Sequence, residues 1–248
     1  MPQKTVVYAI YMPCTLEEYN IGHLWTTCKV TAREADVVKV LRNEIAEHED
    51  MGRCRNTVKE IDFSKMVPGF LRVVFPRDAL KMTETSYNAF PRCTTRYVTR
   101  ALSEKKFALR VDTVLLDGMR HLSDPFSSLP PADRCEVISL FDKEVQLAEG
   151  FDASELRDEA GEKRFYEGWE KERAPVMTIF KRVQIDLHIA LIGKRYIGEV
   201  EKFVKKIFTQ GHQEIIKYNT EWKSLNIVQV KEEEERVKKE LESRKVKK

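Results

Sequence analysis

The 248-residue sequence lacks the features that mark membrane-spanning, secreted and zinc-binding proteins. No apolar run approaches the roughly 20 residues that a transmembrane helix needs. The apolar run near the N-terminus is short and is broken by Pro13, so we expect no signal peptide. The five cysteines are odd in number, irregularly spaced and without a CxxC pair, which argues against a disulfide framework or a structural zinc site. We therefore expect a cytoplasmic protein that contacts membranes only peripherally and transiently.

The sequence also lacks a strong net charge and the common catalytic motifs. Its 43 basic and 40 acidic residues leave a net charge of +3, which is too little for the broad basic field of a nucleic-acid-binding protein. The five histidines are scattered, and neither HExxH nor GxSxG occurs. A nucleophile–base pair or a metal cluster is therefore not indicated. We expect no catalytic residues, no metal and no cofactor.

The residues that are present indicate a mixed domain with a substantial core. Hydrophobic residues make up 42% of the chain, and charged residues, at 33%, can cover a solvated surface. Lys4–Met12 alternates as a strand does, and Thr15 with Glu18 has the pattern of a capping box that begins a helix. Further strands are predicted over residues 37–45, 56–63, 69–75, 92–99, 107–116, 135–141 and 177–189, and helices over 81–88 and 198–218.

A long helix near each end with strands between them predicts an α+β domain, in which one curved sheet wraps around a helix. We expect residues 1–230 to form this domain as a monomer. Residues 148–173 are charged and mixed, and predict a helix or an excursion over the surface. Residues 231–248 are charged throughout and predict a helical extension or tail, which is either simply solvated or binds a partner.

Two lysines fall on apolar strand faces. Residues two apart in a strand share a face, so Lys59 lies with Thr57 and Ile61, and Lys181 is the only charge on the apolar face of residues 177–187. A lysine buried in apolar surroundings without a partner is costly and tends to lose its proton. Either each lysine lies near a strand end and reaches water, or both belong to a polar site inside an apolar pocket.

Other polar residues fall on comparable faces. Thr113 is a lone hydroxyl on an apolar face, Cys93 and Thr95 share a face, and Glu84 and Asn88 lie on one side of the predicted helix over 81–88. A phosphate diester with a polyhydroxylated headgroup would satisfy this set. Cations would bind its phosphate, and carboxylate and amide groups would bind its hydroxyls.

The segment MVPGFLRVVFPRDALKMTETSYNAFPRCTTRYV closely resembles the headgroup region of class I phosphatidylinositol transfer proteins. CTLEEYNIGHLW resembles the first helix of that family, FALRVDT a following strand, and IFTQGHQEIIKYNTEW its C-terminal helix. The resemblance runs from about Val6 to Lys239. It implies a START-like helix-grip fold, in which a concave antiparallel sheet and helices enclose a lipid cavity. It also implies exchange of phosphatidylinositol for phosphatidylcholine between membranes, with the phospholipid as cargo.

The resemblance assigns roles to eight residues. Those that would contact the inositol ring are Thr57, Lys59, Glu84 and Asn88. Those that would lie at or near the phosphate are Cys93, Thr95, Thr113 and Lys181. Strand alternation and spacing single out the same residues, which favours the polar-site interpretation.

The sequence departs from the family in three places. The family's membrane-inserting tryptophan pair falls near Ile189 and Ala190, so docking would depend on the aliphatic residues Ile189, Leu191 and Ile192. That run is alternatively the end of a buried strand. A headgroup-contacting glutamate on the C-terminal helix has no unambiguous match. The family's regulatory serine loop has no clear match near residues 155–170.

Two rival functions stay open. An enzyme on a similar fold, such as a cyclase or hydrolase, would need a catalytic cluster that the scattered histidines do not suggest. A lipid sensor or presenter would bind a sterol or another phospholipid without net transfer. Mass spectrometry of lipid extracted from the protein, followed by a two-membrane transfer assay, separates these possibilities.

Overall fold

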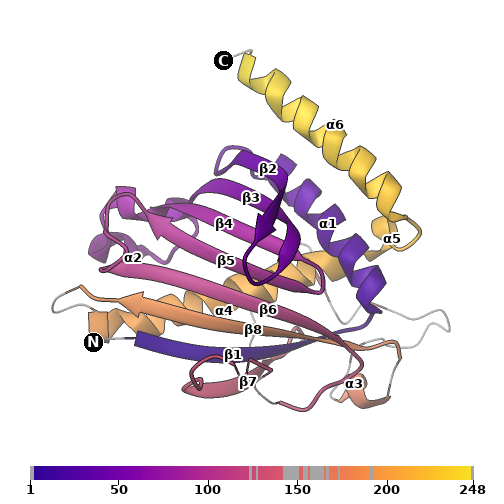
Figure 1. The fold of residues 1–248 in the computed structure, drawn as a ribbon, viewed down its shortest axis with the longest axis horizontal. Coiled ribbons are helices and arrows are strands. Elements are labelled where there is room, and N and C mark those ends of the chain that lie inside the picture. The colour runs from indigo at the N-terminus through magenta and orange to yellow at the C-terminus, as the bar shows by residue number, and fades with distance from the viewer. Residues whose placement is uncertain are drawn as a thin grey trace.

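The computed structural model describes residues 3–122, 125–126, 128–141, 151–152, 156, 165, 168–172, 174–189 and 193–246. These residues form a curved eight-stranded sheet with helices packed against it (Figure 1). The strands are β1 (Gln3–Met12), β2 (Val38–His48), β3 (Gly52–Asp62), β4 (Lys81–Ala89), β5 (Arg92–Thr99), β6 (Phe107–Asp117), β7 (Arg134–Ile138) and β8 (Met177–Leu187). The α-helices are α1 (Leu16–Arg33), α2 (Gly69–Val74), α3 (Trp169–Glu172), α4 (Gly193–Lys217), α5 (Asn219–Trp222) and α6 (Ile227–Val246).

The strand order is β2-β3-β4-β5-β6-β8-β1-β7. Neighbouring strands are antiparallel except β1 and β7, which are parallel. The prediction of an α+β domain with a curved sheet is confirmed, although the sheet is mixed rather than wholly antiparallel. The parallel pair arises because β7 follows a long connection after β6 and joins the far edge of the sheet, where no hairpin can set its direction.

The predicted capping box at the start of α1 is present. The Thr15 hydroxyl accepts a hydrogen bond from the Glu18 amide at 3.2 Å, and the Glu18 carboxylate accepts one from the Thr15 amide at 2.8 Å. These bonds satisfy amide groups that the first turn of a helix leaves without partners. The helix therefore begins directly after β1 and runs back across the sheet, where it contacts β6, α4 and α6.

The main core lies between the central strands and α4. Tyr8, Ile179 and Ile185 are fully buried there, and Val200 and Val204 of α4 pack against them. A smaller apolar cluster on the other face of the sheet includes Val7, Ala9, Phe126 and Phe180. Because β1 and β8 are covered on both faces, each strand has buried apolar residues on both sides, with Tyr8 and Ile179 in the main core and Val7 and Phe180 in the smaller cluster.

In two segments the predicted secondary structure is wrong: a predicted strand is a helix, and a predicted helix is a strand. Residues 69–75 form helix α2, which follows Pro68 and buries Leu71 and Phe75, four residues apart, on one side. Residues 81–89 form strand β4, which pairs with β3 and β5. Short segments have little structure of their own, so tertiary pairing and packing decide between helix and strand. Glu84 and Asn88 still share a side, since a separation of four is even and also preserves the face of a strand.

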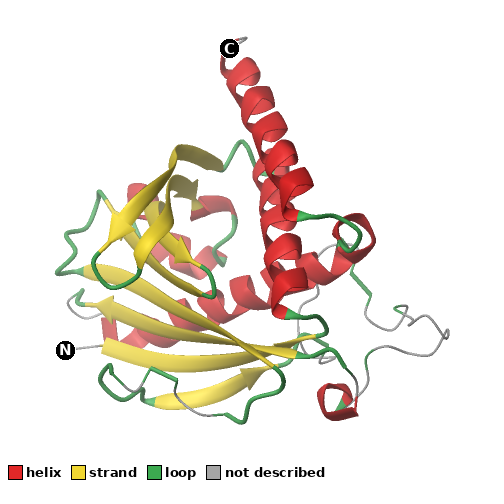
Figure 2. Cartoon of the chain, turned by 45° about the vertical axis from the view of Figure 1, so that its right-hand side comes forward, coloured by secondary structure: helices red, strands yellow, loops and turns green. Residues whose placement is uncertain are grey.

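The charged C-terminal segment belongs to helix α6, which runs alongside α1 (Figure 2). Val230 and Val237 of α6 are buried, at 1% and 6% exposure, so the expected boundary at residue 230 falls inside a packed helix. The segment predicted over 148–173 lies largely outside the described residues. None of the helices in the described ranges combines the length and the apolar character needed to cross a membrane.

Candidate functional site

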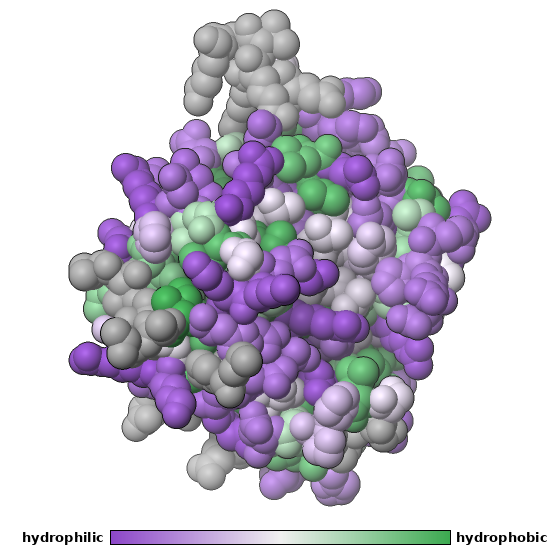
Figure 3. Space-filling model, turned by 60° about the vertical axis from the view of Figure 1, so that its left-hand side comes forward, coloured by the Kyte–Doolittle hydropathy of each residue, from purple (hydrophilic) through white to green (hydrophobic). Residues whose placement is uncertain are grey.

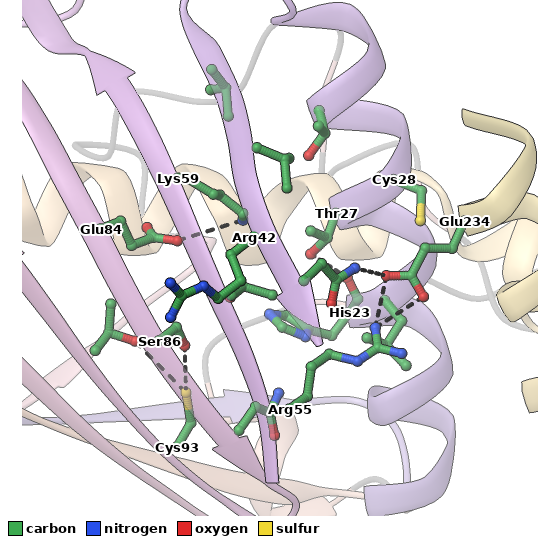
Figure 4. A pocket seen from close by; sticks show the side chains of 18 of the residues that line it. His23, Thr27, Cys28, Arg42, Arg55, Lys59, Glu84, Ser86, Cys93 and Glu234 are labelled. Atoms are coloured by element: carbon green, nitrogen blue, oxygen red, sulfur yellow. Dashed lines mark hydrogen bonds and ion pairs between the residues drawn. The ribbon is translucent and has the colours of Figure 1, made fainter. Parts of the chain in front are cut away.

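A cavity of about 1390 Å³ lies between α1, α6 and the inner face of the sheet (Figure 4). It exceeds the roughly 300–1,000 Å³ of typical small-molecule sites. All eight residues predicted for the headgroup site line it: Thr57, Lys59, Glu84, Asn88, Cys93, Thr95, Thr113 and Lys181. The structure thus brings together residues that lie up to 124 positions apart in the sequence (181 − 57).

Strand register produces this convergence. Directly paired residues form one continuous row across five strands: Arg55, Asn88, Cys93, Thr113 and Lys181. A parallel row joins Thr57, Ser86 and Thr95, and a third joins Lys59, Glu84 and Tyr97. Directly opposed side chains point to the same side of a sheet, so each row presents its polar groups to the cavity.

Lys59 and Glu84 form an ion pair inside the cavity. The Lys59 Nζ and a Glu84 carboxylate oxygen are 3.5 Å apart, and both side chains are mostly buried. The Tyr97 hydroxyl donates a hydrogen bond of 2.8 Å to the other Glu84 oxygen. Burial and the neighbouring Glu84 raise the pKa of Tyr97, which keeps its hydroxyl a donor. The carboxylate is therefore held in place and can still accept hydrogen bonds from a ligand.

Lys181 lies deeper in the same cavity. Its ammonium donates a weak hydrogen bond of 3.4 Å to the Thr113 hydroxyl and lies 5.0 Å from the centre of the Phe208 ring. Within the described part of the chain, no carboxylate pairs with it. Burial lowers the pKa of Lys181, because the ammonium is poorly solvated there. Such a cation attracts an anionic ligand.

A group of short polar side chains lies between these two lysines. The Thr95 hydroxyl donates to the Ser86 hydroxyl at 3.1 Å, and the Cys93 sulfur lies 3.3 Å from the same oxygen. Figure 4 shows Ser86 and Cys93 on adjacent strands, facing the cavity. These hydroxyl and thiol groups can donate hydrogen bonds to a phosphate without adding charge.

Helix α1 supplies a polar stripe that the sequence analysis missed. Tyr19, His23, Thr27 and Thr31 recur every four residues and all line the cavity. The Tyr19 hydroxyl lies 3.3 Å from Nε2 of His212 on α4, and the Nδ1 of that histidine lies 2.6 Å from the Phe208 carbonyl oxygen. The spacing of four between these polar side chains is the sequence signal that could have revealed the stripe.

Helix α6 closes one side of the cavity with Glu234. Both Glu234 carboxylate oxygens accept from the Arg55 guanidinium, at 2.7 and 2.9 Å, and one also accepts from the Asn43 amide at 3.0 Å. Arg55 is the direct strand partner of Asn88. A carboxylate from α6 therefore reaches the cavity, from a helix that lies after the segment 207–222 in which the resemblance placed the C-terminal helix.

A smaller apolar cavity of about 80 Å³ lies beneath α2. Val67, Leu71 and Phe75 cover it from one side, and Val200 and Val204 of α4 from the other. It shares Tyr97, Val111 and Phe208 with the larger cavity. The two spaces are therefore neighbours, and the smaller one is lined almost wholly by apolar residues.

The predicted membrane-docking residues are only partly described. Ile189 is half-buried and packs against the main core, whereas Leu191 and Ile192 lie outside the described residues. Met66 and Phe70, beside and on α2, are exposed apolar side chains. Other exposed large apolar side chains in the described ranges are Leu41, Ile45, Phe90, Leu122, Val137, Ile227 and Val228. The Phe70 ring stacks on that of Tyr196 in α4, with centroids 6.4 Å apart.

In the described ranges, no three His, Cys, Asp or Glu residues are grouped in a way that could hold a metal ion. None of the five cysteines, all of which lie in the described ranges, forms a disulfide. The polar residues that line the cavity are suited to binding a polar group.

Comparison with known proteins adds an independent finding. A family model described as phosphatidylinositol transfer protein matches residues 3–239. The chain is 27% identical to Cytoplasmic phosphatidylinositol transfer protein 1 of Xenopus tropicalis, over 96% of this chain and 74% of that protein. It is 25% identical to Phosphatidylinositol transfer protein 1 of Dictyostelium discoideum, over 96% and 94% of the two chains. Identity to the human Phosphatidylinositol transfer protein beta isoform is also 25%, over 95% and 92%.

Proposed function

Because this chain belongs to the phosphatidylinositol transfer protein family, we propose that it carries one molecule of phosphatidylinositol or phosphatidylcholine and exchanges it between membranes. It acts as a lipid carrier in the cytoplasm, not as an enzyme. The observation that carries this proposal is one large cavity that holds both the Lys59–Glu84 pair and Lys181, whose ammonium has no carboxylate partner among the described residues.

The cost of exposing acyl chains makes a cavity necessary. A diacyl phospholipid has about 30 methylene and methyl groups, each worth roughly 0.8 kcal/mol when removed from water. The total of about 25 kcal/mol forbids release of the bare lipid into water. The protein must therefore keep one lipid enclosed and open only at a membrane, where a second lipid enters as the first leaves.

The polar subsites account for the two headgroups. Lys181, Thr113, Thr95 and Cys93 surround the place for the phosphate, which phosphatidylinositol and phosphatidylcholine share. Lys59, Glu84, Asn88 and Thr57 surround the place for the inositol ring, and the new candidate Glu234 lies at its α6 side. Inositol hydroxyls would add hydrogen bonds to these groups, whereas a choline has no hydroxyl or N–H to offer them.

We place the membrane-docking surface on α2 and the start of α4. Met66 and Phe70 are 44% and 45% exposed, and Lys65, Arg72, Lys194 and Arg195 are exposed near them. Figure 3 views the molecule from the side that carries the α2 end of the sheet, where green hydrophobic patches lie among purple hydrophilic side chains. Apolar insertion combined with basic residues suits an anionic membrane surface. The buried side of α2 covers the apolar cavity, so docking and opening would involve the same segment.

Two measurements test the function. Lipid extracted from the purified full chain is identified by mass spectrometry, and transfer of labelled phosphatidylinositol and phosphatidylcholine is followed between two vesicle populations. We expect both lipids to co-purify and to be transferred. Co-purified sterol without transfer would support a lipid sensor instead, and the absence of any lipid would reopen the question of an enzyme.

A matched pair of variants links transfer to the cavity. Lys181→Met removes the buried charge while retaining an unbranched apolar side chain, so the fold should persist and transfer of both lipids should fall. Lys105→Met makes the same change at an exposed position in the turn before β6 and should leave transfer unchanged. Equal activity of the two variants would contradict the proposed phosphate subsite.

A further inference from the structure

His23 occupies an unusual position in the cavity wall. It projects from α1 toward the strands that carry Ser86 and Cys93 (Figure 4). Its ring stacks on that of Tyr19, with centroids 5.6 Å apart and an angle of 17° between the planes. Tyr19 in turn stacks on His212 of α4. The imidazole is therefore held in a fixed orientation by packing, although it lies at the edge of an open space.

Neither ring nitrogen of His23 makes a hydrogen bond with a described residue, whereas His212 has a partner at each nitrogen. Both histidines stack on Tyr19, and they differ in this respect. His212 is satisfied by the protein and serves packing. His23 has hydrogen-bonding capacity that is left for a ligand in the cavity.

The charges that face His23 come from several elements. Lys181 on β8 and Lys59 on β3 are its cationic neighbours, and Glu84 on β4 is paired with Lys59. Tyr19 on α1 and His212 on α4 are neutral, since burial raises the pKa of the former and lowers that of the latter. Burial first, then Lys181 and Lys59, lower the pKa of His23 to about 4. The neutral imidazole has one N–H donor available at pH 7.

We propose that His23 is a further phosphate-binding residue, which donates a hydrogen bond to the phosphate diester attracted by Lys181, and that entry of this anion draws a proton from water onto the imidazole. Phospholipid binding is then coupled to proton uptake. This inference rests on the proposed function and adds to it a residue and a pH response. Because the phosphate diester is common to phosphatidylinositol and phosphatidylcholine, the response applies to both lipids.

The direction of the effect follows from linkage. An anion beside His23 stabilises the imidazolium, so the pKa of the residue is higher with lipid bound than without it. At pH values between the pKa of His23 without lipid and its pKa with lipid bound, lipid binding takes up a proton. The affinity for lipid therefore rises as the pH falls, by up to about tenfold per pH unit. Lipid release, and with it exchange, should therefore slow at acidic pH.

The test uses the full chain loaded from vesicles of phosphatidylcholine or of phosphatidylinositol. The ³¹P resonance of the bound lipid is followed by NMR between pH 5 and 8, together with the rate of transfer. The variant His23→Gln keeps an N–H donor but cannot titrate. The control His121→Gln changes an exposed histidine that does not line the cavity.

We expect the ³¹P resonance to titrate in the wild type and in the control, but not in His23→Gln. Transfer by the wild type should slow by about 3- to 10-fold on acidification, and transfer by His23→Gln should change by less than about twofold. An unchanged ³¹P titration in His23→Gln would overturn the inference while leaving the carrier function intact. Failure of the wild type to load any phospholipid would refute the proposed function and this inference together.

A second measurement covers the case in which His23→Gln does not fold. Histidine-selective ¹⁵N NMR of the loaded wild type should show one imidazole that titrates with the same midpoint as the ³¹P resonance, for both lipids. If no histidine shares that midpoint, the inference is wrong.

Discussion

The Lys59 ammonium lies 3.5 Å from the Glu84 carboxylate, and the two residues are direct partners in the pairing of β3 with β4. The Tyr97 hydroxyl on the neighbouring strand β5 donates a hydrogen bond to the Glu84 carboxylate and holds the pair in place. Because each of these charges has a partner of opposite sign, both side chains can keep their positions in the cavity before an inositol ring binds. A ligand hydroxyl can then accept from the lysine and donate to the carboxylate at once. This arrangement leads to our first prediction.

Lys59→Ala or Asn88→Ala should lower phosphatidylinositol transfer by at least about tenfold, because a hydrogen bond to a charged or buried polar group is lost. Phosphatidylcholine transfer should change little, because choline has no hydroxyls for these groups. Transfer of each labelled lipid is measured separately between vesicles. Lys105→Ala, at an exposed site, serves as the control. An equal loss of both activities would contradict the division of the cavity into phosphate and inositol subsites.

Cys93 should react with a thiol reagent only while the protein engages a membrane. Its sulfur lies against Ser86 and Thr95 in the cavity, so a bound headgroup would cover it. We expect adducts of N-ethylmaleimide at Cys93, detected by peptide mass spectrometry, to form at least about tenfold faster when vesicles are added. Cys135, half-buried on β7, provides an internal reference. Rapid labelling of Cys93 without vesicles would count against a lipid-filled resting state.

Gly22→Ala should destabilise the protein by about 1–3 kcal/mol through overpacking. A Cβ atom at Gly22 would lie 2.6 Å from the Trp222 ring. That ring cannot easily move, since it is 3% exposed and its Nε1 donates to the Ile215 carbonyl at 2.8 Å. Gly211→Ala, in open space on α4, should instead stabilise by about 0.5–1 kcal/mol. Denaturant unfolding of both variants checks the difference in sign.

The buried His212 should make stability depend on pH in mildly acidic solution. Burial first, and then Lys181, lower its pKa from an ordinary value of 6.5 to about 3. The unfolded chain therefore binds a proton that the native protein excludes, so this contribution is complete above about pH 6.5 and declines as the pH falls toward 3. Its slope is at most about 1.4 kcal/mol per pH unit.

The variant His212→Asn keeps a donor for the Phe208 carbonyl but does not titrate. Its free energy of unfolding, measured between pH 7 and 4, should be lower than that of the wild type at neutral pH and should depend less steeply on pH. His23 would contribute a second proton of the same sign in the lipid-free protein. An identical slope in wild type and variant would show that His212 is not kept neutral by burial.

Local patterns allowed much of the sheet and most of the site to be predicted. Alternation placed Thr57 with Lys59, and Cys93 with Thr95, on inner faces, because the side-chain period of a strand is a property of its own backbone. The Thr15–Glu18 capping box is likewise a contact within one turn. The predicted structures of residues 69–75 and 81–88 were wrong, since both segments are too short for propensity to outweigh packing.

The sequence by itself determined, through alternation, which face of a strand carries polar groups. Six of the eight candidate residues lie on strands that were predicted as strands. Only the tertiary structure decided that Arg55, Asn88, Cys93, Thr113 and Lys181 form one row, and that His23 and Glu234 face it from two helices. The physical reason is that periodicity is local, whereas register and helix docking depend on contacts between segments far apart in the chain.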